Sequence, residues 1–373
     1  MKFCLPANFN IDEIERYKEF ENSYNGNFVE EVYGNINNVA PIGSGRGFLP
    51  EQRTDYALHN LKEYIKELHK NGIKFNYTIN ASCTGNVELN KKGYLSLLRF
   101  MEDLLEQEVD KVTVSSPALI ELIKNNFPEI SITASSIMDI NSVGRAKWVK
   151  NLGVSTIALP EELSRQLTII EAINSVCDIE TEVILNTMCL FHCPYKKSHY
   201  NALSHMENNQ DYVEYFTESC SRLKNLHIEE YIKMPWIRPE DTNVYQKCGV
   251  KYFKIIGRER VHKMDLLKML TYYCNGCYTG NLLELLYGFP KDEKYNVYIN
   301  NKALDGYINR FVKENTCKEM CGFTNCSYCK SYADKAIHRI NHEIKNTEEI
   351  FNDFISYGIL DRPEKEDFIR GLL

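Results

Sequence analysis

Short apolar runs and amphipathic helical stretches alternate along the first two thirds of the chain, and this rhythm limits the folds that it can adopt. Nine runs have the length and the β-branched or aromatic content of buried strands. They are Lys2–Pro6, Phe28–Tyr33, Lys74–Asn80, Lys111–Ser115, Ser131–Ala134, Thr156–Leu159, Glu182–Thr187, Tyr231–Met234 and Tyr252–Ile256. Strands that alternate with helices predict a mostly parallel sheet, and eight or nine of them predict closure into a TIM-like (β/α) barrel.

Helical patterns lie between these runs, and Asp55–Asn71 is the clearest of them. Its leucine and isoleucine residues recur every three or four positions and form one apolar stripe. Gly72 marks the C-terminal end of the predicted helix. From about Leu266 the alternation gives way to helical patterns with one extended stretch, Pro290–Asn301. The sequence therefore predicts a barrel over 1–265 and a small, cysteine-rich, mostly helical C-terminal extension over 266–373.

The composition is that of a folded globular protein, with 43% hydrophobic and 25% charged residues. A formal net charge of -7 gives no general attraction to phosphates, so any contact with nucleic acid requires a local patch. The amino terminus lacks the apolar run of a signal peptide, and no window approaches roughly 18 consecutive apolar residues. We expect a cytoplasmic protein without a membrane span.

Four cysteines crowd one short segment of the extension, namely Cys317, Cys321, Cys326 and Cys329, with the spacing C-x3-C-x4-C-x2-C. A reducing compartment keeps thiols available to metals, so metal ligation is the leading interpretation. Four thiolates can hold either a 4Fe-4S cluster or zinc. Zinc sites usually pair two C-x2-C units across a longer loop, so the crowded loop favours the cluster, with zinc as the alternative.

A second set of cysteines is expected on the functional face of the barrel. Cys189 and Cys193 follow the strand pattern Glu182–Thr187, and catalytic residues of such barrels gather at the carboxyl ends of the strands. Cys220 comes later, in a helical stretch. The pair Cys189 and Cys193 is therefore a candidate metal or catalytic site, and ordinary buried thiols are the alternative.

Three basic residues are candidates for substrate binding. Arg46 lies in the glycine-rich turn IGSGRG and can clamp a carboxylate, unless it is an ordinary surface arginine. Lys254 and Arg258, in KIIGRER, form a basic patch near a predicted strand end, where an anionic cosubstrate or an RNA phosphate could dock. The alternative for Arg258 is a structural salt bridge with Glu259 or Glu240.

Several of these segments together resemble one family, the collagenase-like peptidase family U32. The segment TASSIMDINSVGRAKWVKNLGVSTIALPEELS is similar to that family's strand, helix and strand that end in an A-R-E-L-S-like turn. NTMCLFHC, the later Cys220 and KYFKIIGRER, which is similar to F-K-I-E-G-R, add to the match. The resemblance covers roughly residues 1 to 265.

The resemblance implies a 4Fe-4S cluster at the barrel mouth and oxygen-independent hydroxylation of an aromatic or nucleobase carbon. It carries over Cys189, Cys193 and Cys220 as cluster ligands. The four cysteines of the extension are absent from the relatives behind this resemblance, so together the two cysteine sets predict a second metal site and two clusters in all.

One departure concerns the fourth ligand of the barrel cluster. Where many relatives have a cysteine, this chain reads YIKMPWIRPED, with Met234 and Pro235 near the expected position. Either Cys83 or Cys248 completes the site, or one iron is left open to a substrate or an oxygen donor.

The favoured function is thus an iron-sulfur enzyme that hydroxylates, or otherwise modifies by redox chemistry, a small aromatic, nucleobase or peptide substrate. Such an enzyme implies an electron donor or a homologous partner subunit, and no membrane. A peptidase is the runner-up, although the chain has no HExxH motif and no G-x-S-x-G motif. An RNA-modifying factor and a noncatalytic electron-transfer module are further alternatives.

Overall fold

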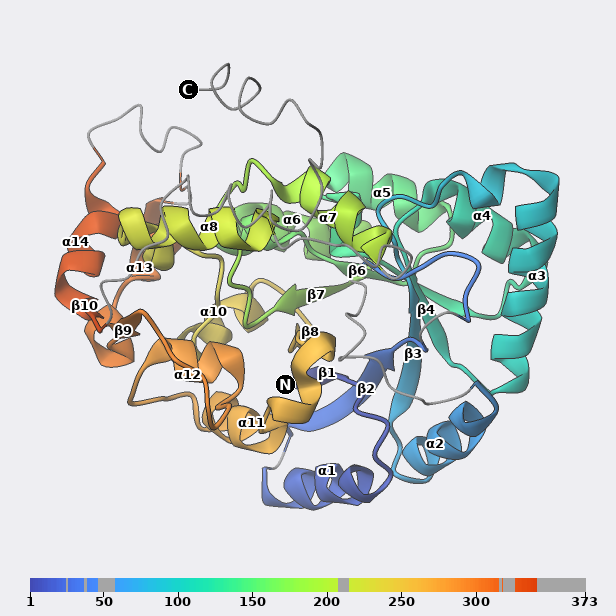
Figure 1. Cartoon of the computed structure of the whole chain (residues 1–373), viewed down its shortest axis with the longest axis horizontal. Coiled ribbons are helices and arrows are strands. Elements are labelled where there is room, and N and C mark those ends of the chain that lie inside the picture. The colour runs from blue at the N-terminus through green and yellow to red at the C-terminus, as the bar shows by residue number, and fades with distance from the viewer. Residues whose placement is uncertain are drawn as a thin grey trace, which may run out of the picture.

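A closed barrel of eight parallel strands, in the order β1 to β8, forms the centre of the chain, and helices surround it (Figure 1). This computed structural model describes residues 1–24, 26–36, 39–45, 58–206, 215–314, 317 and 326–340. The strands are β1 (Lys2–Pro6), β2 (Phe28–Gly34), β3 (Lys74–Ile79), β4 (Lys111–Val114), β5 (Ser131–Ala134), β6 (Thr156–Ala158), β7 (Glu180–Ile184) and β8 (Tyr252–Lys254). β1 closes the barrel because it pairs with both β2 and β8. The predicted TIM-like barrel is confirmed.

The helices that follow the first six strands cover the outside of the barrel. They are α1 (Asp12–Ser23), α2 (Leu58–Lys70), α3 (Lys91–Glu106), α4 (Pro117–Asn126), α5 (Val143–Asn151) and α6 (Leu167–Cys177). The longer crossing from β7 to β8 holds α7 (Lys196–Ser204), α8 (Tyr215–Leu226), α9 (Glu229–Lys233) and α10 (Thr242–Lys247). The predicted stripe on α2 is confirmed, since Leu61, Ile65 and Leu68 are fully buried.

The predicted strand at Tyr231–Met234 is wrong, because Tyr231–Lys233 belong to the helix α9 and Met234 is its C-cap. The barrel already closes with β8 against β1, which leaves no edge for a further strand. Tyr231 and Ile232 are instead buried on α9, and Lys233 pairs with Glu230 one turn earlier at 2.6 Å. A short apolar run of this kind fits a buried helix as well as a strand.

Charged side chains fill part of the barrel interior in matched pairs. Lys111 Nζ lies 3.1 Å from Glu31, and Lys254 Nζ lies 2.9 Å from Glu182. The Cys4 sulfur lies within 4.8 Å of both carboxylates, and burial raises its pKa well above the usual value. Each carboxylate is paired with a lysine, so the charged groups of this cluster form an ion-pair network.

The extension packs against the β7–β8 crossing. It contains α11 (Leu266–Asn275), α12 (Leu282–Tyr287), β9 (Val297–Ile299), α13 (Asn309–Glu314), α14 (Tyr328–Ala336) and β10 (Ile337–Arg339), and β9 pairs with β10 (Figure 1). The ring of Tyr307 lies 5.6 Å from that of Trp236, and the Tyr273 hydroxyl donates to the Ile237 carbonyl at 3.0 Å. The core therefore continues across the predicted boundary at residue 265. No helix in the described ranges is long and apolar enough to cross a bilayer.

Candidate active site

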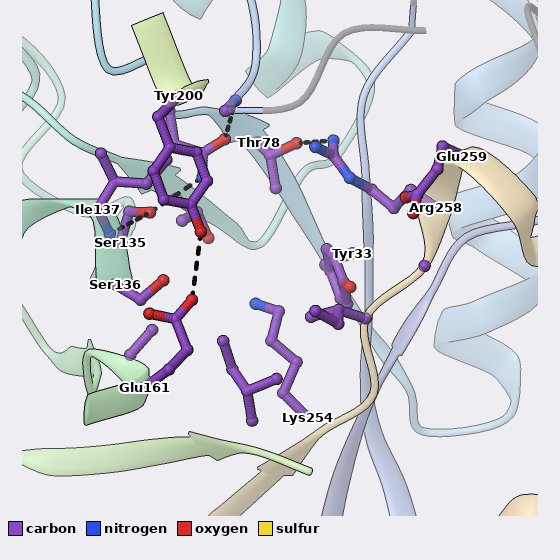
Figure 2. Close-up of a pocket in the computed structure, with 17 residues that line it drawn as sticks. Tyr33, Thr78, Ser135, Ser136, Ile137, Glu161, Tyr200, Lys254, Arg258 and Glu259 are labelled. Carbon is purple, nitrogen blue, oxygen red and sulfur yellow. Dashed lines mark hydrogen bonds between the residues drawn. The ribbon is translucent and has the colours of Figure 1, made fainter. Parts of the chain in front are cut away.

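The carboxyl ends of the strands surround a cavity of about 100 Å³ in the barrel mouth. Hydroxyl, amine and carboxylate groups line it together with apolar side chains, and Figure 2 shows Tyr33, Ser135, Ile137, Glu161 and Lys254 around this space. Such a mixture is typical of small-molecule sites. An apolar cavity of roughly 150 Å³ can hold benzene, and the volume of about 100 Å³ here is of the order of one small ring.

Lys254 presents an ammonium group to this cavity, paired with a buried carboxylate. The side chain extends from β8, and its ammonium group lies 2.9 Å from Glu182 and 4.0 Å from the centre of the Tyr33 ring. Burial disfavours the charged form, but Glu182 and then Tyr33 outweigh burial, so the pKa of Lys254 is raised. The side chain therefore remains an ammonium group at neutral pH.

Arg258 reaches the same cavity from the turn after β8. Gly257 before it has a φ of +132°, and a Cβ there would lie 2.7 Å from the Met264 sulfur, so the turn requires glycine. The guanidinium group donates hydrogen bonds to Asn35, and to Thr78 Oγ1 at 2.5 Å (Figure 2). Lys254 and Arg258 thus line one cavity, and their role in substrate binding stays a prediction. Arg46 lies outside the described residues.

A second, smaller cavity of about 30 Å³ is lined by Cys189 and Cys193. Burial is the largest effect on the pKa of the Cys193 thiol and raises it. A hydrogen bond from the Tyr195 backbone lowers this pKa, and the charge of Cys220 raises it. Cys220 on α8 therefore lies within electrostatic range of Cys193. When two thiols lie close together, the negative charge of one disfavours ionisation of the other. A bound cation would stabilise both thiolates.

The three thiols at the barrel mouth are not arranged around a single zinc ion. Among the described residues, Cys189, Cys193 and Cys220 do not gather within 4.8 Å of one another, whereas a single zinc ion with bonds of about 2.3 Å would require this. Pro235, which lines this cavity, offers no ligand atom. Cys248 lies at the opposite end of the barrel, beside Glu180 and Lys251.

Cys83 lies on the carboxyl side of β3 and does not line the cysteine cavity. Its backbone N–H donates to Ser204 Oγ at 3.4 Å, at the end of α7. Neither Cys83 nor Cys248 therefore lines the cysteine cavity, and among the described residues neither is placed as a fourth ligand.

Glu161 and Tyr200 form a shared wall, since both line the central cavity and the cysteine cavity. Glu161 begins η4 (Glu161–Arg165), directly after β6, and Tyr200 lies on α7. The Tyr200 hydroxyl donates to Glu161 at 3.2 Å, as Figure 2 shows. Lys196 lies 3.2 Å from Glu161 and 2.9 Å from Glu162, and these carboxylates raise its pKa in spite of burial.

The interpretation of the sequence missed this wall. Glu161 directly follows a predicted strand, so the rule that barrel sites lie at strand ends could have identified it. Lys196 and Tyr200 lie on a helix within the long β7–β8 crossing, where no periodicity or motif distinguishes them.

The described cysteines of the extension, Cys317, Cys326 and Cys329, line neither of the two cavities. Cys321 lies outside the described residues. The metal site predicted from their spacing is thus separate from the barrel mouth.

The chain is a TIM-like barrel with a mixed polar cavity and a cysteine pair at the strand ends. It belongs to peptidase family U32, whose family model matches residues 51–273. The predicted family is confirmed. An uncharacterized protease of Methanocaldococcus jannaschii is 31% identical over 299 residues, which cover 79% of this chain and 86% of that protein.

Two further relatives are named for RNA hydroxylation. The tRNA hydroxylation protein P of Haemophilus influenzae is 28% identical over 149 residues, or 40% of this chain and 31% of that protein. A 23S rRNA 5-hydroxycytidine synthase of Escherichia coli is 28% identical over 142 residues, or 38% of this chain and 20% of that protein. A solved U32 peptidase structure matches with a TM-score of 0.50 and 16% identity over 69% of this chain and 92% of that one, which supports the fold.

Proposed function

We propose that the chain is an iron-sulfur enzyme that hydroxylates a carbon of a nucleobase in RNA. The observation that carries this proposal is the shared wall, because Glu161 and Tyr200 separate a ring-sized cavity from the cysteine cavity by one layer of side chains. The two relatives named for hydroxylation of tRNA and rRNA support the class of substrate.

Cys189, Cys193 and Cys220 would hold the cluster. Bound there, a cluster supplies one-electron redox chemistry and an iron without a fourth thiolate. The prediction of a 4Fe-4S cluster in the barrel thereby becomes part of this proposal, together with an oxygen donor other than dioxygen.

The residues of the central cavity would bind and orient the base. A flipped base is read through hydrogen bonds and stacking, and Thr78, Asn80 and Ser135 offer polar atoms beside Ile137 and Tyr33. Arg258 adds positive charge for the phosphate or another anionic group, and Lys254, whose charge Glu182 balances at 2.9 Å, offers a hydrogen-bond donor. This local charge matters because the chain as a whole carries a formal charge of -7.

Glu161 is the group placed to accept a proton. When a hydroxyl group replaces a ring hydrogen, two electrons pass from the ring to the oxygen donor and the hydrogen leaves as a proton. Glu161 is a buried carboxylate at the cavity wall, and Lys196 Nζ lies 3.2 Å from it. A positioned base of this kind contributes about 10²–10⁴-fold to a rate.

The test compares RNA from cells that lack the gene with RNA from complemented cells. Mass spectrometry of nucleosides should show that one hydroxylated nucleoside is missing from cells that lack the gene. The wild-type chain and the Cys277→Ser variant should restore this nucleoside, and the Cys193→Ser variant should not. Anaerobically purified Cys193→Ser should also have less iron than Cys277→Ser, whose cysteine is exposed and remote from the cavities. Identical RNA with and without the gene would refute the proposed substrate, and unchanged iron would refute the barrel cluster.

A peptidase is the second candidate, because Cys193 and His199 line the same cavity. Thiol proteases pair these two residue types as nucleophile and base. This pairing predicts peptide hydrolysis that both Cys193→Ser and His199→Ala abolish without any need for iron. The raised pKa of Cys193 opposes it, since a nucleophilic cysteine needs a lowered pKa.

A further inference from the structure

The segment η4, which carries Glu161 of the shared wall, is short and has few backbone bonds of its own. The Leu163 N–H donates to the Pro160 carbonyl at 3.0 Å, and Pro160 offers no side-chain cap at the start of the segment. A 3₁₀ turn also has poorer hydrogen-bond geometry than an α-helix. The position of Glu161 therefore depends on what holds the two ends of η4.

Arg165, the last residue of η4, is buried beneath the extension, with 2% of its surface exposed. Its guanidinium carbon lies 4.9 Å from the centre of the Trp236 ring and 5.2 Å from those of Tyr307 and Phe311. One amino group donates to the Met234 carbonyl at 3.0 Å. Two of the three rings lie beyond residue 273, where the match to the family model ends, so they belong to the extension.

A further bond holds the same end of η4 to the β7–β8 crossing. The Tyr245 hydroxyl of α10 is fully buried and donates to the Ser164 carbonyl at 2.7 Å. Ser164 and Arg165 are consecutive, so the crossing and the extension together fix this end of the segment. At the opposite end, Glu161 contacts α7 through the ion pair and the hydrogen bond of the shared wall.

Stability alone does not explain a cation at position 165. Among the described residues no carboxylate forms an ion pair with Arg165, and its Nε has no hydrogen-bond acceptor. Asp241 acts on it electrostatically but already pairs with Arg238 at 2.9 Å. Aromatic faces compensate a buried charge only in part, and an apolar residue in place of a buried ion is often neutral or stabilising. An apolar residue lacks direction, however, whereas the guanidinium group is planar and donates from a fixed fork.

We propose that Arg165 is a positioning residue, through which the extension holds η4 and thereby holds Glu161 at the shared wall. At about 2.0 Å per residue, the two ends of η4 lie roughly 8 Å apart. A shift of Arg165 therefore reaches Glu161 over little more than one turn, and a misplacement of about 1 Å can cost about 10²-fold in rate. The effect on the reaction rests on the proposed function, whereas the effect on η4 does not.

Hydrogen exchange followed by mass spectrometry tests the position of η4 without any substrate. Arg165→Met keeps a long, unbranched side chain that packs well against aromatic rings, but it loses the charge and the donors. The amides of η4 should exchange at least about tenfold faster in this variant, at an unchanged melting temperature, and Arg165→Lys should regain part of the protection. Unchanged exchange in η4 would overturn the proposal, and so would faster exchange throughout the chain at a lower melting temperature.

Phe311→Leu and Phe289→Leu are a matched pair that decides the question if Arg165→Met does not fold. Each ring belongs to the extension and lies against a cation, Phe311 against Arg165 at 5.2 Å and Phe289 against the exposed Lys268 at 4.1 Å. Phe311→Leu should speed exchange in η4, and Phe289→Leu should not. Equal exchange in η4 in the two variants would contradict a role of the extension.

Complemented cells show whether the position of η4 matters for the reaction. After induction, the hydroxylated nucleoside should accumulate at least about tenfold more slowly with Arg165→Met than with the wild-type chain, at equal iron content. Arg165→Lys should be intermediate. A wild-type rate with Arg165→Met would overturn the link to Glu161. If the wild-type chain itself restores no nucleoside, the proposed function fails, and exchange in η4 still decides whether Arg165 positions the segment.

Discussion

Lys254 and Glu182 neutralise each other inside the barrel, where the loss of one partner leaves a buried unpaired charge. Lys254→Met should lower the free energy of unfolding by about 3–5 kcal/mol, and the double variant Lys254→Met/Glu182→Gln should recover part of that loss. Urea unfolding measures both. Lys251→Met is the matched control, because Lys251 pairs with Glu180 at the exposed end of the same strand pair, with side-chain exposures of 58% and 36%.

The control should change the free energy of unfolding by less than about 1 kcal/mol, as exposed ion pairs do. Equal losses in the Lys254→Met and double variants would show that the two buried charges are not coupled.

Glu161→Gln tests the shared wall at the level of one atom. The amide oxygen can still accept the Tyr200 hydrogen bond, but the side chain can no longer take up a proton. The hydroxylation rate should fall by about 10²-fold or more with the iron content unchanged. Asp139→Asn is the control, since Asp139 also pairs with Lys196, at 3.1 Å, but lines neither cavity. Loss of iron in Glu161→Gln would instead assign the residue a structural role.

At the level of single elements, α3 depends on a glycine at its start. The Asn90 side chain caps the helix by accepting from the Gly93 N–H at 2.8 Å, and a Cβ at 93 would lie 2.0 Å from the Val87 carbonyl oxygen of η2 (Val87–Leu89). Gly93→Ala should therefore lower the free energy of unfolding by about 1–3 kcal/mol. Thermal and urea unfolding measure the change.

Gly144 in α5 is the matched control, because no atom lies within 4 Å of a Cβ built there. Gly144→Ala should raise the free energy of unfolding by up to about 1 kcal/mol, since alanine favours a helix more than glycine does. A similar loss in both variants would mean that helix propensity, and not the contact with η2, governs Gly93.

The strands were predictable because a buried parallel strand is a short apolar run between helices. This signal located all eight strands of the barrel, and the strand-end rule placed Cys189, Cys193 and Lys254 on one face. The same signal failed at Tyr231–Met234, where a short apolar run lies in α9.

The shared wall could not be predicted, since Tyr200 and Glu161 are brought together by the fold of the β7–β8 crossing. Arg165 likewise carries no sequence pattern that reports its burial under three aromatic rings.

At the scale of the whole molecule, the barrel and the extension share one hydrophobic core. A fragment of residues 1–265 would expose Trp236, which is fully buried against Tyr307, and leave Arg165 without two of its three aromatic rings. We expect this fragment to lose cooperative unfolding and to bind a hydrophobic dye. A fragment that ends at Ile340 keeps every described contact and should unfold cooperatively.

Circular dichroism and dye fluorescence measure the two properties. A cooperative transition of the 1–265 fragment at the midpoint of the full chain would show that the barrel is stable without the extension.

The pairing of β1 with β8 sets the order of events while the chain is being made. Lys2 has no neighbour on one side until Tyr252 leaves the ribosome, so nearly the whole barrel is synthesised with two open sheet edges. Contacts between residues so distant in sequence form slowly, and unpaired strand edges invite association with other chains. We therefore expect the nascent chain to need protection until β8 emerges, and codons that slow translation once β8 has left the ribosome to improve the yield of soluble protein.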